Sequence, residues 1–423
     1  MIKVLQGDCR EILATMPDCS ADSIVTDPPY GLSFMGKHWD YDVPGVDIWR
    51  ECLRVLKPGG HLLSFAGTRT QHRMAVNIED AGFEIRDMIA WVYGSGFPKS
   101  KNVALSIDKG EGHPDRGHRI AVANRHHPDG TLEPNGENIP AYEAKSEAGR
   151  KWQGWGTALK PAMEPITMAR KPLAGTVAVN VLAHGTGGIN IDGCRVGSEK
   201  ITTTNGKGFN GSFEGGTNNN GGAVREGRWP ANLIHDGSEE VVGLFPNAGN
   251  GHWSYKPAKD GGIYKYGLKD MPDGGSDKTV SSAARFFYCA KASKRDRDEG
   301  CEGMEEKRGG ADYRPNDDGT AGIQSRLHGS TIKGRNHHPT VKPTDLMRYL
   351  VRLVTPPGGI VLDPFAGSGS TGVACAEEGF GFIGIEREAE YCEIARARIE
   401  NRGGLFCTSN TVITETSKQR GLS

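Results

Sequence analysis

Three things are scarce in this sequence: apolar residues, an excess of charge of either sign, and regularly spaced cysteines. Apolar residues make up 36% of the 423 residues, and aromatic residues 7%. No apolar run reaches membrane-spanning length, and the opening segment, residues 1–5, lacks the apolar core of a signal peptide. We therefore expect a cytoplasmic protein that does not contact a membrane.

The formal net charge is -1, so the chain as a whole carries no basic signal for nucleic acid, although a basic groove can lie on a neutral protein. The nine cysteines include no Cys-x-x-Cys pair and no zinc-site spacing. The adjacent pairs His126-His127 and His337-His338 would point to opposite faces of a strand, which makes them poor chelators. We expect reduced thiols and no metal.

Glycine and proline, by contrast, are abundant, with 60 and 23 residues, which is typical of a normal core that carries long loops. In residues 1–98, short apolar runs alternate with amphipathic segments. This pattern predicts strands at 3–6, 23–26, 61–65 and 83–92, and helices at 9–16, 46–56 and 70–81. Such a rhythm favours a parallel sheet with helices on both faces.

The same rhythm returns in residues 336–402, with helices predicted at 344–354, 370–378 and 388–401, and strands at 360–362 and 382–385. Between these halves the pattern weakens. We predict an inserted loop region at 99–160, a late strand within 161–175, a glycine-rich region at 176–335 and a frayed tail at 403–423. The glycine-rich region holds a Gly/Asn-rich segment at 205–222 and short possible strands near 232–234 and 285–289.

One motif, Asp27-Pro28-Pro29-Tyr30, directly follows the predicted strand at 23–26. The two prolines fix the backbone and remove two N–H donors, which leaves carbonyl groups to face a ligand. The Asp27 carboxylate and the Pro28 carbonyl can then accept the two hydrogens of an exocyclic amino group. The ring of Tyr30 offers a face on which a base can stack.

A second motif, Asp363-Pro364-Phe365-Ala366-Gly367-Ser368-Gly369, lies between a predicted strand and a helix. Its glycines let backbone approach a ligand, and the helix N-terminus favours an anionic group such as a carboxylate. Glu386 ends the next strand, where a carboxylate can accept both hydroxyls of a ribose. The spacing matches neither Gly-x-Gly-x-x-Gly nor a P-loop, so dinucleotide and nucleoside-triphosphate sites are disfavoured.

Together these motifs resemble the DNA amino-methyltransferases, enzymes that use S-adenosylmethionine to methylate an exocyclic nitrogen. The order, with the Asp-Pro-Pro-Tyr motif first and the glycine motif last, is similar to the permuted β class. Three further segments look like the family's, at Gln6-Gly7-Asp8-Cys9, Glu164–Lys171 and His338–Pro343. The region 176–335 stands where the family's variable target-recognition region would be.

The resemblance implies a fold, a reaction and a set of site residues. The fold would be the Rossmann-like S-adenosylmethionine-dependent methyltransferase fold, α/β and circularly permuted, with a mixed, mostly parallel seven-stranded sheet and a loop-rich target-recognition region. Residues 1–98 would form the catalytic half and 336–402 the cofactor-binding half. The base would be bound by Asp27, Pro28, Pro29 and Tyr30. The cofactor would be held by Asp8, Cys9, Lys342, Asp363, Pro364, Phe365, Gly367, Ser368, Gly369 and Glu386.

The reaction implied is methylation of the N6 amino group of an adenine that has been flipped out of double-stranded DNA. N4-methylation of cytosine uses the same chemistry and stays open. A protein that binds DNA and cofactor without catalysis is a further alternative, as is a fused nuclease at Glu305-Glu306-Lys307, a run more typical of a solvated surface. A homodimer and a partner restriction nuclease are both compatible with the sequence. The loop 31–44 is a candidate lid over the base.

Overall fold

The computed structural model describes residues 1–32, 42–94, 96, 100–113, 125–126, 132–133, 142–203, 223–248, 281–290, 295–308 and 333–403. The chain divides into two compact units. The first is formed by Met1–Gly94, Glu164–Glu305 and Thr340–Ser423, and the second by Ser95–Met163 and Glu306–Pro339. Residues 1–94 and 340–402, which are most of the two predicted halves at 1–98 and 336–402, belong to the first unit.

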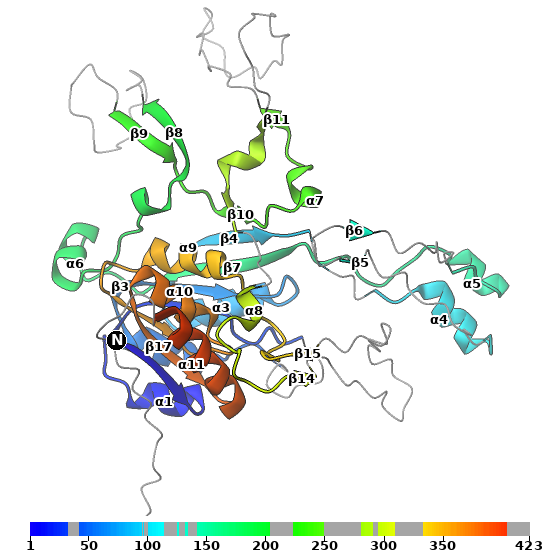
Figure 1. Cartoon of the computed structure of the whole chain (residues 1–423), viewed down its shortest axis with the longest axis horizontal. Helices are drawn as coiled ribbons and strands as arrows, with labels where there is room; N and C mark the ends of the chain where they lie inside the picture. Colours follow the sequence, from blue (N-terminus) through cyan, green and yellow to red (C-terminus); the bar gives the residue numbers. More distant parts are fainter. Residues whose placement is uncertain are drawn as a thin grey trace, which may run out of the picture. The chain divides into compact units, whose positions relative to one another are not determined.

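The first unit is built on one large sheet, which contains nine strands among the described residues (Figure 1). In spatial order these are β1 (Ile2–Gln6), β17 (Gly381–Glu386), β16 (Ile360–Asp363), β2 (Ala21–Thr26), β3 (Leu56–Phe65), β7 (Met163–Arg170), β4 (Glu84–Val92), β10 (Leu233–His235) and β13 (Tyr288–Cys289). The pairs β1–β17, β17–β16, β16–β2 and β2–β3 are parallel, and β3–β7 is antiparallel. The expected mixed, mostly parallel sheet is confirmed.

The order of strands brings the two ends of the sequence together. Strands β16 and β17, from the C-terminal part, lie between β1 and β2, from the N-terminal part. Leu362 pairs with Ile24, and Glu386 pairs with Gln6. Because these strands are parallel, their carboxyl ends share one edge of the sheet, which is where ligands bind in open α/β folds.

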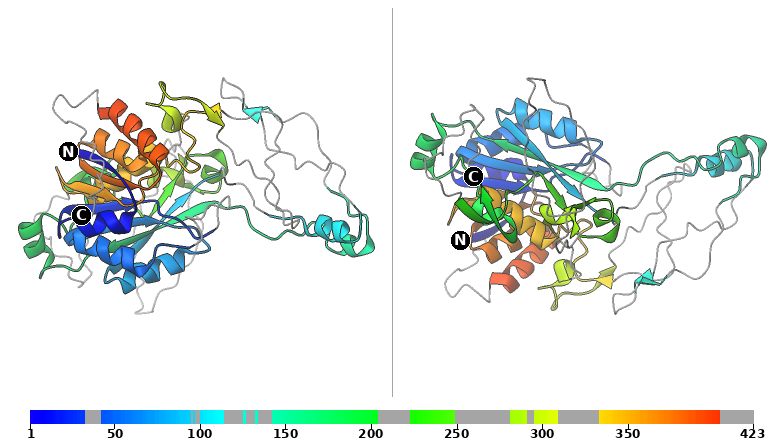
Figure 2. Two further views of the ribbon diagram at one scale, coloured as in Figure 1. Left: turned by 90° about the horizontal axis from the view of Figure 1, so that it is seen from below. Right: turned by 90° about the horizontal axis from the view of Figure 1, so that it is seen from above.

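Helices cover both faces of this sheet, as predicted (Figure 2). On one face, α1 (Cys9–Thr15), α2 (Val46–Val55) and α3 (Gln71–Asp80) contribute to a buried core that includes Leu13, Trp49 and Met74. On the other, α9 (Thr344–Val354), α10 (Ser370–Glu378) and α11 (Ala389–Gly403) share a second core. The predicted helices at both ends of the chain are therefore confirmed to within a few residues.

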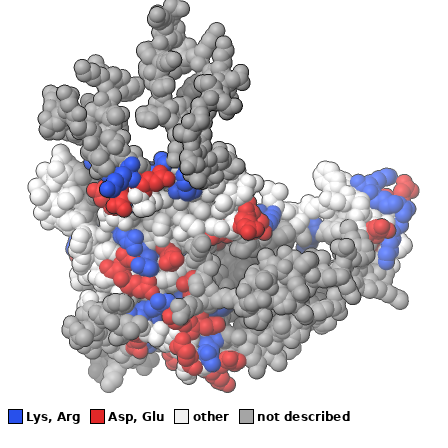
Figure 3. Space-filling model, turned by 45° about the horizontal axis from the view of Figure 1, so that its top comes forward, with Lys and Arg blue, Asp and Glu red and all other residues white. Residues whose placement is uncertain are grey.

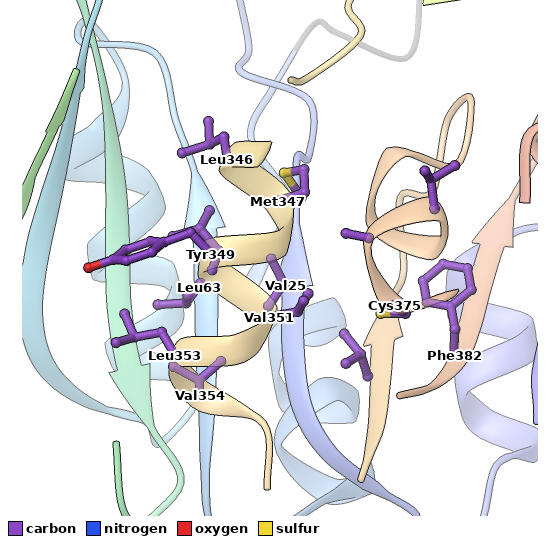
Figure 4. Packing of buried hydrophobic residues seen from close by; sticks show 14 of the residues in the cluster. Val25, Leu63, Leu346, Met347, Tyr349, Val351, Leu353, Val354, Cys375 and Phe382 are labelled. Atoms are coloured by element: carbon purple, nitrogen blue, oxygen red, sulfur yellow. The ribbon is translucent and has the colours of Figure 1, made fainter. Parts of the chain in front are cut away.

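Helix α9 is central to the second core (Figure 4). The predicted apolar face, with Leu346, Tyr349, Leu350 and Leu353, is buried. Met347, Val351 and Val354 are buried as well, so the helix is covered on more than one side. The ring of Tyr349 stacks on that of Tyr288 from β13, with centroids 4.0 Å apart. This contact ties the glycine-rich region to the core.

The rest of the first unit is made of short elements. They are α6 (Val177–His184), η3 (Asp192–Cys194), the antiparallel pair β8 (Val196–Thr203) and β9 (Ala223–Arg228), α7 (Glu239–Val242), the pair β11 (Asn247–Ala248) and β12 (Ser281–Ser282), η4 (Ala283–Phe286) and α8 (Arg295–Asp298). The charges on the visible described surface are mixed, with acidic and basic side chains interspersed (Figure 3).

The second unit contains α4 (Val103–Gly110) and α5 (Glu147–Lys151), which pack together, and the short pairs β5 (Arg125–His126) with β6 (Leu132–Glu133) and β14 (Lys307–Arg308) with β15 (Lys333–Gly334). Asp108 is buried between the two helices. Its carboxylate accepts hydrogen bonds from the hydroxyls of Tyr142 and Ser146 and from the Lys145 backbone N–H, which satisfies the buried charge.

Three expectations differ from the structure. Among the described residues the sheet has nine strands where seven were implied, because the short strands predicted near 232–234 and 285–289 form as β10 and β13 and continue the sheet beyond β4. Strand β3 begins at Leu56 and not at the predicted residue 61, because residues 57–60 form a bulge opposite Asp22. The region predicted as loop contains α4 and α5. The tail at 404–423, the segment 205–222 and most of the predicted lid lie outside the described residues.

Candidate functional site

The Asp-Pro-Pro-Tyr motif lies at the carboxyl end of β2, at the middle of the sheet. Every residue of β2 is buried, so the strand fixes the point at which the motif leaves the sheet. Pro28 is buried, and the other three residues of the motif are partly buried. The backbone carbonyl of Tyr30 accepts a hydrogen bond of 2.6 Å from the Thr70 hydroxyl, at the start of α3.

Four polar side chains from different parts of the sequence meet at this motif. The Lys342 ammonium lies 2.7 Å from Asp27 Oδ2 and 3.1 Å from Glu164 Oε2. The Tyr30 hydroxyl lies 2.7 Å from Asp27 Oδ1 and 2.9 Å from Glu164 Oε2. The network therefore joins the Asp-Pro-Pro-Tyr motif at the end of β2, strand β7 and the segment before α9. Its side chains are well shielded, with 8% exposure for Lys342 and 20% for each carboxylate.

The surroundings shift two pKa values in this network. Burial lowers the pKa of Lys342, but the charges of Asp27 and Glu164 and their hydrogen bonds outweigh it, and the pKa lies above the ordinary lysine value. Burial, and then the same two carboxylates, raise the pKa of the Tyr30 hydroxyl well above its usual value. At neutral pH the network thus holds one ammonium and a protonated phenol.

The second motif follows β16, the strand next to β2. Asp363 is buried under the turn, where its carboxylate accepts hydrogen bonds of 2.6 Å from both the Thr26 and Thr371 hydroxyls and one of 3.1 Å from the Phe365 N–H. Burial raises its pKa to about 6, against these hydrogen bonds, which lower it. The Thr26 bond links the ends of the two strands that carry the two motifs.

The glycine turn is shaped by left-handed backbone and by close packing. Gly367 has φ +51° and donates its N–H to Glu386 Oε2 at 2.9 Å. Gly369 has φ +80° and precedes α10, and a Cβ there would lie 2.8 Å from Ala395 Cβ on α11. A side chain at Gly369 would therefore require both strained backbone and displacement of α11.

Under the turn lies a residue that the sequence did not single out. Arg398, on α11, is 2% exposed, and its guanidinium donates to the backbone carbonyl of Ser368 and, at 3.0 Å, to the Ser368 hydroxyl. Burial lowers the pKa of Arg398 to about 10, which leaves it charged at neutral pH. Arg398 is buried and bonded to Ser368, so it positions this residue of the turn.

Two carboxylates stand at the carboxyl ends of the neighbouring strands β1 and β17. Glu386 ends β17, and burial raises the pKa of its carboxyl against hydrogen bonds from the Glu388 and Gly367 N–H groups, which lower it. Asp8 follows β1 and caps α1 by accepting from the Arg10 N–H at 2.8 Å. Burial and Asp8 raise the pKa of Cys9 to about 11, so it is a neutral thiol.

The remaining predicted residues lie on the same sheet edge or beside it. Phe365 packs its ring edge to face against Trp49 of α2, with centroids 6.4 Å apart. Pro364 is buried at the start of the turn. The structure thus brings all the predicted site residues to two adjacent motifs and to the strand ends next to them. Lys342, however, contacts Asp27 of the Asp-Pro-Pro-Tyr motif, and its role as a cofactor ligand stays a prediction.

Glu164 was not predicted as a site residue. The segment Glu164–Lys171 stands out in the sequence only by its family resemblance, yet the Glu164 carboxylate lies 3.1 Å from Lys342. A charged residue at the start of a strand that is otherwise buried was the available signal.

Among the described residues, no group of three or more His, Cys, Asp or Glu side chains is arranged to hold a metal ion. In the part of the chain that the structure describes, no helix is long and apolar enough to span a bilayer.

Known proteins match the chain as follows. The model of a DNA methylase family, N6_N4_Mtase, matches residues 21–181 and 198–397. Type II methyltransferase M2.DpnII of Streptococcus pneumoniae is 47% identical over 68 residues, which are 16% of this chain and 25% of that protein. YubD of Escherichia coli K12 is 45% identical over 71 residues, 17% of this chain and 31% of that protein. The chain thus spans about a quarter to a third of these curated relatives.

Among solved structures, that of the complex of M1.HpyAVI with SAM is similar, with a TM-score of 0.37 and 16% identity. The match covers 94% of this chain and 99% of that one.

Proposed function

The chain belongs to the N6/N4 DNA methylase family, and from this premise we propose that it is a site-specific DNA methyltransferase that methylates the N6 amino group of adenine. One observation carries the proposal. The Asp-Pro-Pro-Tyr motif and the glycine turn end two adjacent parallel strands, joined by the 2.6 Å hydrogen bond from Thr26 to Asp363. An amino group held at the first motif is then close to a methyl donor held at the second.

S-adenosylmethionine is the cofactor that membership of this family implies, and the residues present fit it. Asp8 and Glu386 lie at adjacent strand ends. The Glu386 carboxylate suits the ribose hydroxyls of the cofactor, and the Asp8 carboxylate suits the amino group of the cofactor's adenine. Each carboxylate oxygen that accepts a backbone N–H keeps a second lone pair for such a contact. The left-handed turn at Gly367–Gly369 leaves room at the sheet edge. The cofactor supplies an electrophilic methyl group on a cationic sulfur.

The chain's own residues supply the acceptors for the target amino group. The Asp27 carboxylate and the Pro28 carbonyl would accept its two hydrogens, which frees the nitrogen lone pair from the ring. The Asp27 carboxylate is held before substrate binds by the Tyr30 hydroxyl and the Lys342 ammonium, each at 2.7 Å, and the proline ring at position 28 restricts the backbone that carries the second acceptor. Positioning and preorganised charge would therefore provide most of the rate enhancement.

The target base must leave the helix, because its amino group cannot be reached in stacked duplex DNA. Extrusion costs a few kcal/mol, and stacking on an aromatic ring recovers roughly 1–3 kcal/mol. Tyr30 is the aromatic residue of the motif, and its carbonyl is tied to Thr70. Double-stranded DNA is accordingly the proposed substrate.

Cytosine N4 presents the same two amino hydrogens, so the acceptor pair at Asp27 and Pro28 serves either base. We propose adenine on the basis of the aspartate in the first position of the motif, which in the resembling enzymes leans toward adenine.

Sequencing of modified bases in cells that express the protein tests the proposal. We expect N6-methyladenine in one short sequence context, and none in cells that express Asp27→Ala at the same level. Methylated cytosine at a fixed site would replace adenine as the substrate. Unmodified DNA in cells that contain the folded wild-type protein would refute the proposed activity.

A further inference from the structure

Glu164 is the one member of the polar network at Asp27 without a role in the reaction proposed above. Its carboxylate, at the start of β7, faces the Lys342 ammonium at 3.1 Å, the Tyr30 hydroxyl at 2.9 Å and the Tyr93 hydroxyl at 3.5 Å. It is 20% exposed. A carboxylate this shielded needs a partner for its charge, and Lys342 is that partner.

The contacts of Lys342 connect Glu164 to Asp27. Its three N–H donors match three acceptors, which are Asp27 Oδ2 at 2.7 Å, Glu164 Oε2 at 3.1 Å and the Tyr30 oxygen at 3.3 Å. The ammonium also lies 4.9 Å from the centre of the Phe65 ring. The cation is therefore fixed beside the carboxylate that is proposed to accept the target amino group.

Charge balance decides what this arrangement can do. Asp27 and Lys342 alone would form a neutral pair. The positive charge of the ammonium would then weaken the Asp27 carboxylate as a hydrogen-bond acceptor for the target amino group. Glu164 adds a second negative charge, so the three side chains carry a net charge of about -1. In a shielded site, that net charge favours the positive charge that develops on the amino nitrogen as it is methylated.

We infer that Glu164 is a positioning residue that balances the charge of Lys342 and so keeps Asp27 available as the acceptor for the target amino group. The inference rests on the proposed methyl transfer. When a base enters, Glu164 keeps its contacts with Lys342 and with the Tyr30 hydroxyl, which both also contact Asp27.

The test is Glu164→Gln, which keeps the size and one acceptor oxygen but removes the charge. We expect the single-turnover methylation rate, at saturating cofactor and DNA, to fall about 10- to 100-fold, as for the loss of one charge-assisted hydrogen bond. Cofactor affinity should stay within twofold of wild type. The matched control is Glu84→Gln, which breaks an ion pair with Arg170 at the other end of β7 and should leave the rate unchanged.

Two results would overturn the inference. One is a single-turnover rate of Glu164→Gln within twofold of wild type. The other concerns the double variant with Lys342→Met. If Glu164 balances Lys342, the double variant loses less activity than the product of the two single losses. Losses that multiply would mean that the two residues act independently.

A second measurement does not depend on methyl transfer. The acetylation rate of Lys342, followed by mass spectrometry with Lys171 as the internal reference, reports the ammonium directly. Loss of the Glu164 charge should lower the lysine pKa, and a fall of one unit raises its reactivity about tenfold. Unchanged reactivity in Glu164→Gln would contradict the charge balance. A wild-type protein without methylation activity would refute the proposed function instead and leave this result readable.

Discussion

Replacing Asp27 with asparagine tests the acceptor role at the centre of the proposed site. The carboxylate is held by the Tyr30 hydroxyl and the Lys342 ammonium, each at 2.7 Å, and is 20% exposed. Asparagine keeps the size and one oxygen but removes the charge and one acceptor. Loss of a preorganised partner of this kind costs about 2.7–4 kcal/mol in the transition state, which is about 100- to 1000-fold in rate.

The same substitution should affect stability less than catalysis. Removing one member of a buried ion pair costs about 3–5 kcal/mol when the other charge is left alone. Here Lys342 keeps Glu164 at 3.1 Å, so we expect a loss of only about 1–2 kcal/mol in the free energy of unfolding. Cofactor affinity should change less than threefold, because the Gly367–Glu386 contact is untouched.

The assay measures three quantities on one preparation: the single-turnover rate of labelled methyl transfer, the cofactor dissociation constant by calorimetry, and the urea unfolding curve. Asp27→Asn with the wild-type rate would refute the acceptor role. A rate that falls only in proportion to cofactor affinity would place Asp27 in cofactor binding instead.

Three further results are expected. Gly369→Val would place a Cβ 2.8 Å from Ala395 at a residue with φ +80°, and it should weaken cofactor binding at least about tenfold in equilibrium dialysis. Unchanged affinity would exclude the glycine turn from the cofactor site. Arg398→Met removes the hydrogen bonds to Ser368. It should lower the free energy of unfolding by about 2–4 kcal/mol and weaken cofactor binding in the same dialysis. Burial lowers the pKa of His61 from 6.5 to about 4, so stability should be lost as pH falls from 6.5 through 4, on the order of 3 kcal/mol in all; His61→Gln should flatten that part of the unfolding profile.

Local patterns predicted most of the sheet and its helices because those segments have clear periods. The run from Ile360 to Gly369 combines a buried strand, a left-handed turn and a helix start, and each step has its own residue signal. The adjacency of β16 and β2 could be expected from the family resemblance, because the order of the two motifs matches the permuted class. Apart from that adjacency, each of these features has its signal within a short stretch of the sequence.

The parts that were missed depend on contacts between distant segments. Arg398 is separated by 30 positions from Ser368, and Glu164 by 178 positions from Lys342, so neither pairing has a local signature. Strand β13 lies within the possible strand predicted at 285–289, but its place in the main sheet depends on pairing with β10 and has no local signature. Helices α4 and α5 were not predicted, because the contact that joins them lies between distant segments. It is made by the buried Asp108, and an aspartate in the sequence suggests a surface position.

In the proposed reaction, an amino group held at Asp27 receives the methyl group of the cofactor bound at the glycine turn. The test is to incubate the purified protein with duplex DNA and S-adenosylmethionine that carries a deuterated methyl group, and to analyse the digested nucleosides by mass spectrometry. We expect N6-methyl-2′-deoxyadenosine heavier by the mass of the label, and none with Asp27→Ala. Unlabelled nucleosides from a wild-type protein that binds both cofactor and DNA would contradict it.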